Sequence, residues 1–157
     1  MPETSINIRC ATETDAQRIH ELHLSSVRNL CAANYEPTTI EGWLVNRSAQ
    51  GYLRGIRSGS IFVAETNSRI VGFCEAVPGE VVAVFVDPAV AHQGIGSVLL
   101  EKALSLAKQQ PGKAVRLEAT LNAVGFYEKF GFTSVKSSVV RRNQVEVPIV
   151  IMEHHDG

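Results

Sequence analysis

Residues 84–100 read VFVDPAVAHQGIGSVLL, and this stretch decides the fold class of the chain. An apolar strand runs into a turn at Pro88, and a short loop then ends in Gly94 and Gly96. Apolar residues recur at the helical period after that loop, namely Ile95, Val98, Leu99, Ala103, Leu106 and Ala107. A helix that begins this way directs unpaired backbone N–H groups, at the positive end of its dipole, toward one spot. Because glycine lets an anion approach the backbone closely, the stretch predicts a site for a phosphate or pyrophosphate.

The spacing of the glycines argues against two common phosphate-binding loops. The dinucleotide-binding fingerprint needs a third glycine three residues after the second, and Leu99 stands there. The P-loop needs Gly-Lys followed by Ser or Thr, whereas Ser97 and Val98 follow Gly96. A different phosphate-binding motif is therefore required.

Two stretches instead resemble motifs of the GCN5-related N-acetyltransferase (GNAT) family. Residues 86–96 are similar to its pyrophosphate motif, V-x-P-x-x-R/Q-x-x-G-x-G/A, with Ala91 in the place of Arg or Gln. Residues 118–132, EATLNAVGFYEKFGF, resemble its later motif, N-x-x-A-x-x-F/L-Y-E-K-x-G-F, with Thr120 in the place of Asn. Since both motifs occur in the family's order, the chain is identified as a member of that family.

The resemblance implies an α/β fold in one domain over residues 1–157, with a core of about residues 6–153. Its sheet is expected to be mixed and largely antiparallel, with helices on both faces and a splay between the fourth and fifth strands. The family binds acetyl-coenzyme A (acetyl-CoA) as a cosubstrate, without a metal. The implied contacts are Val84, Phe85, Val86, His92, Gln93, Gly94, Ile95, Gly96, Ser97, Thr120, Asn122 and Tyr127.

Acetyl transfer to an amine needs a deprotonated amine, an oxyanion donor and a proton for the leaving thiolate. A tyrosine hydroxyl, with a pKa of about 10, stays protonated at neutral pH, and the resemblance gives Tyr127 the role of proton donor. Glu80 is the predicted base, and Glu75, Glu118 or a chain of water molecules are its alternatives. The resemblance implies that the oxyanion donor is a backbone amide of residues 84–86.

The pattern of polar and apolar residues predicts the order of elements along the chain. Strands are expected over residues 6–10, 60–65, 70–76, 81–86, 115–119, 132–140 and 145–152. Helices are expected from a capping box at Thr14–Gln17 to about residue 32, after Thr38 or Thr39, over residues 50–57, over 96–109, and from a cap at Thr120 or Asn122 to Gly131. A turn is expected at Pro111-Gly112.

Composition and charge restrict the partners. With 157 residues and a net charge of −1, the chain has no basic excess for nucleic acid or an anionic membrane. It has no apolar run long enough to span a membrane and no signal-peptide pattern. Three widely spaced cysteines favour reduced thiols in the cytoplasm, and His20 and His23 lack the further ligands of a metal site.

The sequence thus predicts an N-acetyltransferase that moves acetyl directly from acetyl-CoA to a primary amine of a small molecule or protein. The family fold implies an acceptor pocket made by the first two helices and the last hairpin, which points to Tyr35, Trp43, Arg28 and Arg141. The alternatives are a non-catalytic acyl-CoA binding or sensing module and a transferase for a longer acyl chain. Both a monomer and a homodimer are compatible with this prediction.

Overall fold

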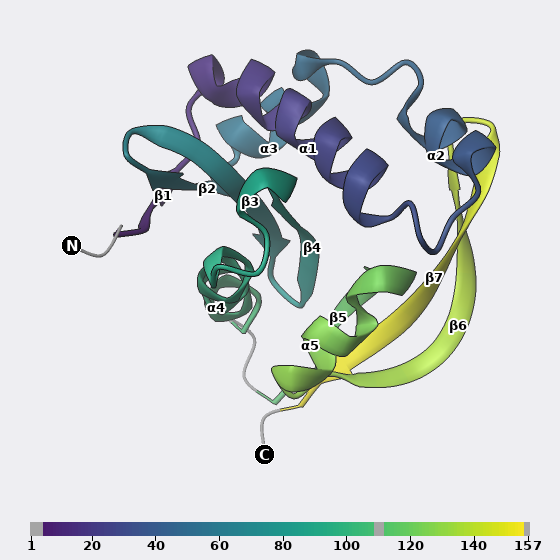
Figure 1. Ribbon diagram of the computed structural model, residues 1–157. Coiled ribbons are helices and arrows are strands. Elements are labelled where there is room, and N and C mark those ends of the chain that lie inside the picture. The colour runs from purple at the N-terminus through teal and green to yellow at the C-terminus, as the bar shows by residue number, and fades with distance from the viewer. Residues whose placement is uncertain (1–4, 109–111, 156–157) are drawn as a thin grey trace.

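The computed structural model describes residues 5–108 and 112–155, and a seven-stranded sheet runs through this part of the chain. The strands follow the spatial order β1-β2-β3-β4-β5-β7-β6, and all neighbours are antiparallel except β4 and β5, which are parallel (Figure 1). Their bounds are β1 Asn7–Cys10, β2 Ile61–Thr66, β3 Arg69–Val77, β4 Glu80–Val86, β5 Val115–Thr120, β6 Thr133–Arg142 and β7 Val145–His154. The predicted fold class is confirmed.

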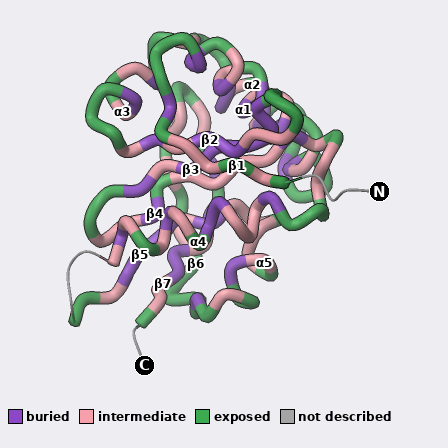
Figure 2. The backbone as a smooth tube through the Cα atoms, turned by 90° about the vertical axis from the view of Figure 1, so that its left-hand side faces the viewer, coloured by how far each residue is buried: buried purple, intermediate pink, exposed green. Residues whose placement is uncertain are grey.

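Helices cover both faces of the sheet. On one face lie α1 (Ala16–Leu30), α2 (Pro37–Leu44) and the short α3 (Leu53–Arg57), whose apolar side chains form two buried clusters with the sheet. On the other face, α4 (Ile95–Ala107) and α5 (Val124–Lys129) pack over the largest cluster. Figure 2 shows buried segments in the central strands and along α4, which packs against them.

The sheet opens between β4 and β5. The two strands pair at a single position, Glu80 with Arg116, and the Arg116 N–H donates to the Gly79 carbonyl at 3.0 Å. Beyond this point they diverge, as the resemblance to the GNAT family implied. Opposite the gap, β4 carries a β-bulge, because Val81 and Ala83 pair with adjacent residues of β3 and Val82 is left over.

The starts of three helices differ from the sequence prediction. The predicted capping box at Thr14–Gln17 is wrong: the box lies at Thr12–Asp15, in a 3-10 turn that precedes α1. The Thr12 N–H donates to the Asp15 carboxylate at 2.7 Å, and Arg9 holds that carboxylate from β1. Asp15, which accepts hydrogen bonds from the Thr12 N–H and from Arg9, thus takes the capping role that the pattern assigned to Gln17.

Proline decides the start of α2, which begins at Pro37 rather than after Thr38 or Thr39. The fixed φ of proline suits the first helical position, and Glu36 before it is extended, with φ −62° and ψ 144°. At the third start, Thr120 precedes a 3-10 turn and Ala123 precedes α5, so neither Thr120 nor Asn122 caps α5 through its side chain. The predicted helix end at residue 109 and residue 111 of the predicted turn lie outside the described residues.

Candidate functional site

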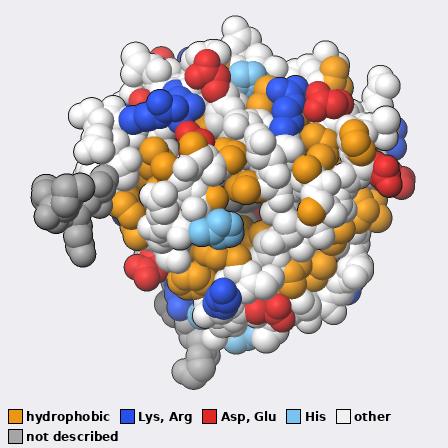
Figure 3. Space-filling model, in the orientation of Figure 1, with side chains coloured by type: hydrophobic (Ala, Val, Ile, Leu, Met, Phe, Trp, Pro, Cys, Tyr) orange, Lys and Arg blue, Asp and Glu red, His pale blue; other side chains and the backbone are white. Residues whose placement is uncertain are grey.

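A cavity of about 790 Å³ lies where β4 and β5 separate. Its walls come from the C-terminal end of α1, residues 81–86 of β4, the loop and first turn of α4, the face of β5, and α5. Figure 3 shows this side of the molecule, where hydrophobic side chains gather around a central histidine. The cavity brings together the two sequence motifs, which are separated in the chain by α4 and β5.

The backbone of β4 offers unpaired polar groups to this cavity. The Asp87 N–H donates to the Val71 carbonyl at 2.8 Å, which fixes the alternation of hydrogen-bonded positions along β4. By that alternation the peptide groups of Val84 and Val86 point away from β3, into the gap, whereas that of Phe85 points toward β3. Val84 and Val86, of the three predicted oxyanion donors, therefore have amides free for a ligand.

The start of α4 forms a backbone cradle. Gly94 adopts a left-handed conformation, with φ +86°, and the first helical hydrogen bond runs from the Val98 N–H to the Gly94 carbonyl at 3.2 Å. The N–H groups of residues 94–97 therefore precede the first helical bond. A Cβ built on Gly96 would meet the Phe126 ring at 3.4 Å, on the side of the cavity. The helix start therefore has the backbone geometry that the sequence predicted, and anion binding there stays a prediction.

Asp87 fixes the approach to this cradle. Its carboxylate accepts the Ala89 N–H at 3.0 Å and an Arg18 N–H at 2.8 Å. The first contact caps the 3-10 turn Pro88–Val90, and the second ties that turn to α1. The loop between β4 and α4 is thus held from both sides.

Tyr127 lies on α5 and borders the cavity, with 7% of its surface exposed. The rings of Phe126 and Phe132 contact it edge-on, at centroid distances of 5.2 and 5.8 Å. Burial raises the pKa of Tyr127 well above its usual value, and Cys74 adds to the shift. Within the described residues its hydroxyl has no hydrogen-bond partner, so it is a protonated donor open to the cavity.

Glu118 is the carboxylate that borders the cavity, whereas Glu80 and Glu75 do not. Glu80 begins β4 at the point where β4 and β5 pair. Glu75 accepts a hydrogen bond from Ser60 Oγ at 3.4 Å, and burial raises the pKa of its carboxyl. Proximity to the cavity therefore favours Glu118 over the predicted Glu80 as a base.

The α1 wall of the cavity could not be read from the sequence. The Cys31 thiol donates to Asn122 Oδ1 at 3.2 Å, and burial raises the pKa of Cys31 to about 11. The Tyr35 hydroxyl donates to the Pro148 carbonyl at 2.6 Å and accepts the Leu121 N–H at 3.0 Å. These bonds join the end of α1 to the β5–α5 connection, which fixes the cavity wall. Neutral Cys31 is therefore a structural group.

Most of the predicted cofactor contacts border the cavity, but two of their side chains do not. Gln93 is exposed on the loop, and the Ile95 side chain is buried in the core beneath α4 with 3% exposure. Bordering residues that the sequence prediction missed include Ser26, Val82, Phe126 and Lys129. Of these, only Phe126 and Lys129 lie in one of the two sequence motifs, so only these two could have been predicted.

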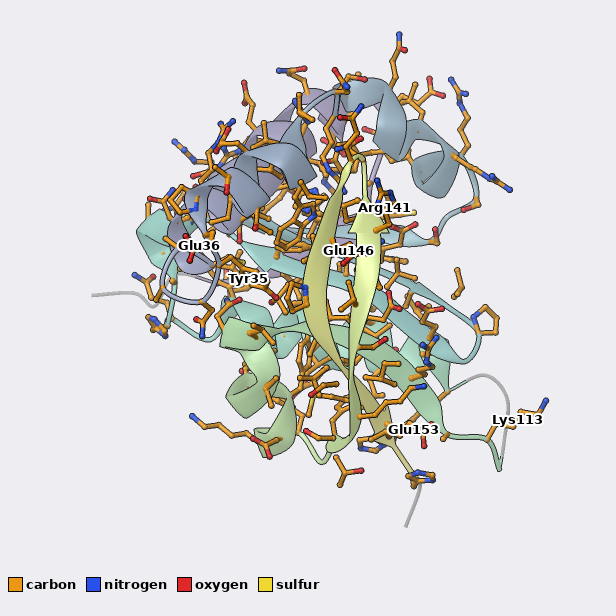
Figure 4. The ribbon with its side chains drawn as sticks, turned by 90° about the vertical axis from the view of Figure 1, so that its right-hand side faces the viewer. Tyr35, Glu36, Lys113, Arg141, Glu146 and Glu153 are labelled. Atoms are coloured by element: carbon orange, nitrogen blue, oxygen red, sulfur yellow. The ribbon has the colours of Figure 1, made fainter. Side chains whose placement is uncertain are left out.

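The four residues predicted for the acceptor pocket do not border the cavity either. Trp43 and Tyr35 are buried in the α2 cluster, with 5% and 7% exposure. Arg28 forms an exposed ion pair with Glu41 at 3.0 Å. Arg141 lies beside Glu146 on the outward face of the β6–β7 hairpin (Figure 4). The acceptor pocket at these residues stays a prediction, although strand parity turns Arg141 outward.

His20 and His23 lie on α1 away from the cavity. His23 Nδ1 is 2.7 Å from the Tyr52 hydroxyl, and burial, helped by Arg47 and His20, lowers the pKa of His23 to about 3. No group of three or more His, Cys, Asp or Glu that could hold a metal occurs among residues 5–108 and 112–155. His23 is a neutral core residue.

Comparison with known proteins decides the family. Residues 31–153 match the model of a family described as the acetyltransferase (GNAT) domain. The chain belongs to the GNAT acetyltransferase family. Over 136 residues, 87% of each chain, it is 24% identical to the uncharacterized N-acetyltransferase YafP of Escherichia coli K12. Over 63 residues, 40% of this chain and 41% of the relative, it is 46% identical to the peptidyl-lysine N-acetyltransferase YjaB of Salmonella typhimurium.

Solved structures of GNAT proteins share the whole fold. A GCN5-related N-acetyltransferase from Rhodopseudomonas palustris superposes with a TM-score of 0.90 at 19% identity, covering 99% of both chains. The PaiA N-acetyltransferase of Thermoplasma acidophilum, solved in complex with coenzyme A, superposes with a TM-score of 0.76 at 26% identity, covering 97% of this chain and 99% of that one. In the part of the chain that the structure describes, no helix is long and apolar enough to cross a membrane.

Proposed function

We propose that this GNAT protein binds acetyl-CoA in the cavity between β4 and β5 and transfers its acetyl group directly to a primary amine. The observation that carries the proposal is the meeting, in one cavity, of the α4 cradle, the unpaired edge of β4 and the Tyr127 hydroxyl. The coenzyme A bound to the PaiA relative supports the same ligand class. A pyrophosphate at the cradle and an extended thiol arm along β4 match these two backbone surfaces.

In this proposal, different residues bind the cofactor and assist the chemical step. The N–H groups of residues 94–97 bind the pyrophosphate, with His92 and Ser97 at its edge, while Thr120 and Asn122 border the thiol end of the arm. The free amide of Val84, beside the Val82 bulge, stabilises the developing oxyanion. Tyr127 donates a proton to the departing thiolate. The thioester bond breaks as the amide bond forms, so no acyl-enzyme is needed.

Glu118 is the proposed base, with Glu80 as the alternative. An attacking amine loses a proton, and a carboxylate must lie within hydrogen-bond reach of it or one water molecule away. The variants Glu118→Gln and Glu80→Gln keep shape and remove the base. We expect kcat/KM to fall more in Glu118→Gln, and its pH profile to lose the limb that reports the base. The reverse ranking assigns the role to Glu80.

The test of the function is an acceptor screen that follows free thiol release from acetyl-CoA, with the acetylated product identified by mass spectrometry. Amine-dependent thiol release from the wild type, lost in Tyr127→Phe, supports the proposal. Binding of acetyl-CoA without turnover of any amine would identify an acyl-CoA binding or sensing module instead. Faster release from a longer acyl-CoA than from acetyl-CoA would show a transferase for longer acyl groups.

A further inference from the structure

Charged side chains gather on the face of β5 that is turned toward α1 and α2. Paired residues in antiparallel strands share a face, so Glu118 lies on the same face as Ile151, which is part of the α2 cluster. Arg116, two residues earlier, shares that face. Arg142 reaches the same carboxylate from the end of β6. The α4 cradle lies under the opposite face of the sheet, so the two sides of the cavity differ in chemistry.

The two guanidinium groups hold Glu118 loosely. Arg116 Nη2 lies 3.7 Å from Glu118 Oε2, and Arg142 Nη2 lies 3.7 Å from Glu118 Oε1. Both distances exceed those of a hydrogen bond. Arg142 Nη1 donates to the Arg141 carbonyl at 3.3 Å, and among the described residues its Nε and Nη2 form no hydrogen bond. Within the described residues, no hydrogen-bond donor engages the Glu118 carboxylate either.

An open carboxylate flanked by two open guanidinium groups is complementary to a molecule that carries both charges. A carboxylate attracts an ammonium group, and the planar guanidinium fork matches a carboxylate or phosphate. Because both arginines reach the same carboxylate, the two charges of such a molecule must be separated by only a few bonds. The Glu118, Arg116 and Arg142 side chains are 28%, 46% and 38% exposed, so a small solute can reach them.

We infer that the acceptor is a small amine that carries a carboxylate or phosphate close to its amino group, bound by Arg142 and Arg116 with the amino group at Glu118. This inference rests on the proposed function and specifies its substrate class. Arg116 is paired in register with two acidic residues, Glu80 of β4 and Glu153 of β7, whereas Arg142 is paired with Val145. Arg142 is therefore the main anion contact. A lysine side chain of a protein, with no anion of its own near the amine, is a poor match for this arrangement.

Matched pairs of amines test the inference. Each pair differs only in the anionic group: L-amino acids against their carboxamides, β-alanine against β-alaninamide, and phosphoethanolamine against ethanolamine. We expect kcat/KM to be higher for the anionic member by about tenfold or more, mostly through KM. The amino-acid and phosphoethanolamine pairs also show whether the anion is a carboxylate or a phosphate.

Variants of adjacent arginines provide the control. Arg142→Ala is expected to remove the preference for the anionic member, and Arg142→Lys to restore part of it, because lysine keeps the charge but not the fork. Arg141→Ala removes an equal charge from the outward face and is expected to keep the preference. Equal turnover of both members, or a preference lost in Arg141→Ala but kept in Arg142→Ala, would overturn the inference and leave acetyl transfer intact. No thiol release with any amine would instead overturn the proposed function, and the inference with it.

Discussion

The two sides of the cavity present different chemical groups to a ligand: backbone groups on one side and charged side chains on the other. On the α4 side, backbone N–H groups at residues 94–97 and the free peptide groups of Val84 and Val86 form the surface. On the β5 side, the side chain of Glu118 borders the cavity, and Arg116 and Arg142 lie beside it. Backbone groups have one fixed geometry, which suits a ligand part that is the same in every reaction. Side chains can differ from one family member to the next without a change of fold, which suits a variable acceptor.

The difference also determines how each side responds to mutation. A backbone surface is damaged mainly by an added Cβ or a change of φ, as at Gly96 or Gly94. A side-chain surface is damaged by removal of one charge, as at Arg142. Tyr127 lies between the two surfaces and should affect neither binding step, only the chemical step.

Tyr127→Phe is expected to have the largest effect. The change keeps the packing against Phe126 and Phe132 and removes only the hydroxyl. Turnover should fall by roughly 10²–10⁴, the usual range for general acid catalysis. Coenzyme A affinity by calorimetry and the KM of the amine should stay near the wild-type values. A merely structural tyrosine would give full turnover with an altered unfolding midpoint, and that result would refute the catalytic role.

His23 should make the fold sensitive to acid, because its ring packs α1 against Phe85 of β4 at a centroid distance of 4.3 Å. Its folded pKa of about 3 lies below that of the unfolded chain, about 6.5, so the unfolded state binds a proton first as the pH falls. The free energy of unfolding should thus drop by about 2 kcal/mol between pH 7 and pH 5 on this account.

Denaturant titrations at both pH values measure that drop. In His23→Gln the contribution of His23 should disappear, whereas His155→Gln, at an exposed position, should keep it. An unchanged pH dependence in the His23 variant would show that this histidine does not control the acid response.

Gly96→Val is expected to weaken coenzyme A binding by about tenfold, because the branched side chain occupies the approach to the cradle N–H groups. A Cβ there already meets Phe126 at 3.4 Å. Gly51→Val is the matched control, since a Cβ at Gly51 meets nothing within 4 Å and Gly51 is remote from the cavity. Calorimetric titrations of both folded variants measure the difference, and equal affinities would remove the pyrophosphate from this cradle.

Salt should have the smallest effect. In the proposed site, backbone dipoles rather than a lysine cluster would hold the pyrophosphate, so raising NaCl from about 0.05 to about 0.5 M should weaken coenzyme A binding by less than about threefold. The half-exposed Arg142 and Arg116 are screened more strongly, so the KM of an anionic amine should rise by a larger factor. A coenzyme A affinity that depends on salt as steeply as the amine KM would contradict the contrast between the two sides.

The α4 side was predictable from the sequence because its determinants are local. The glycine spacing, the strand before it and the helical period after it occupy one short stretch, and the structure has the same strand, loop and helix there. The splay of the sheet was implied by the resemblance to the GNAT family, and β4 and β5 pair at a single position. Local competition between caps explains the misplaced helix starts, since Asp15 and Pro37 offered stronger signals than the residues chosen.

The β5 side was not predictable, because it depends on register and strand parity. Residues 142 and 118 are far apart in the chain, and only the pairing of β5, β7 and β6 brings their charges together. A one-residue error in parity is enough to replace Arg142 by Arg141. The bulge at Val82, which precedes the free amide of Val84, likewise has no local sequence signature.

Backbone and side-chain NMR during two titrations tests the account most directly. Coenzyme A, added first, should shift the amide resonances of residues 94–97, Val84 and Val86, and leave the Arg142 Nε–H resonance in place. An anionic amine, added to the coenzyme A complex, should then shift Arg142 Nε–H and the Glu118 carboxyl carbon. If coenzyme A leaves the amides of residues 94–97 unshifted, or shifts a surface away from the β4–β5 gap, the proposed division of this cavity is wrong.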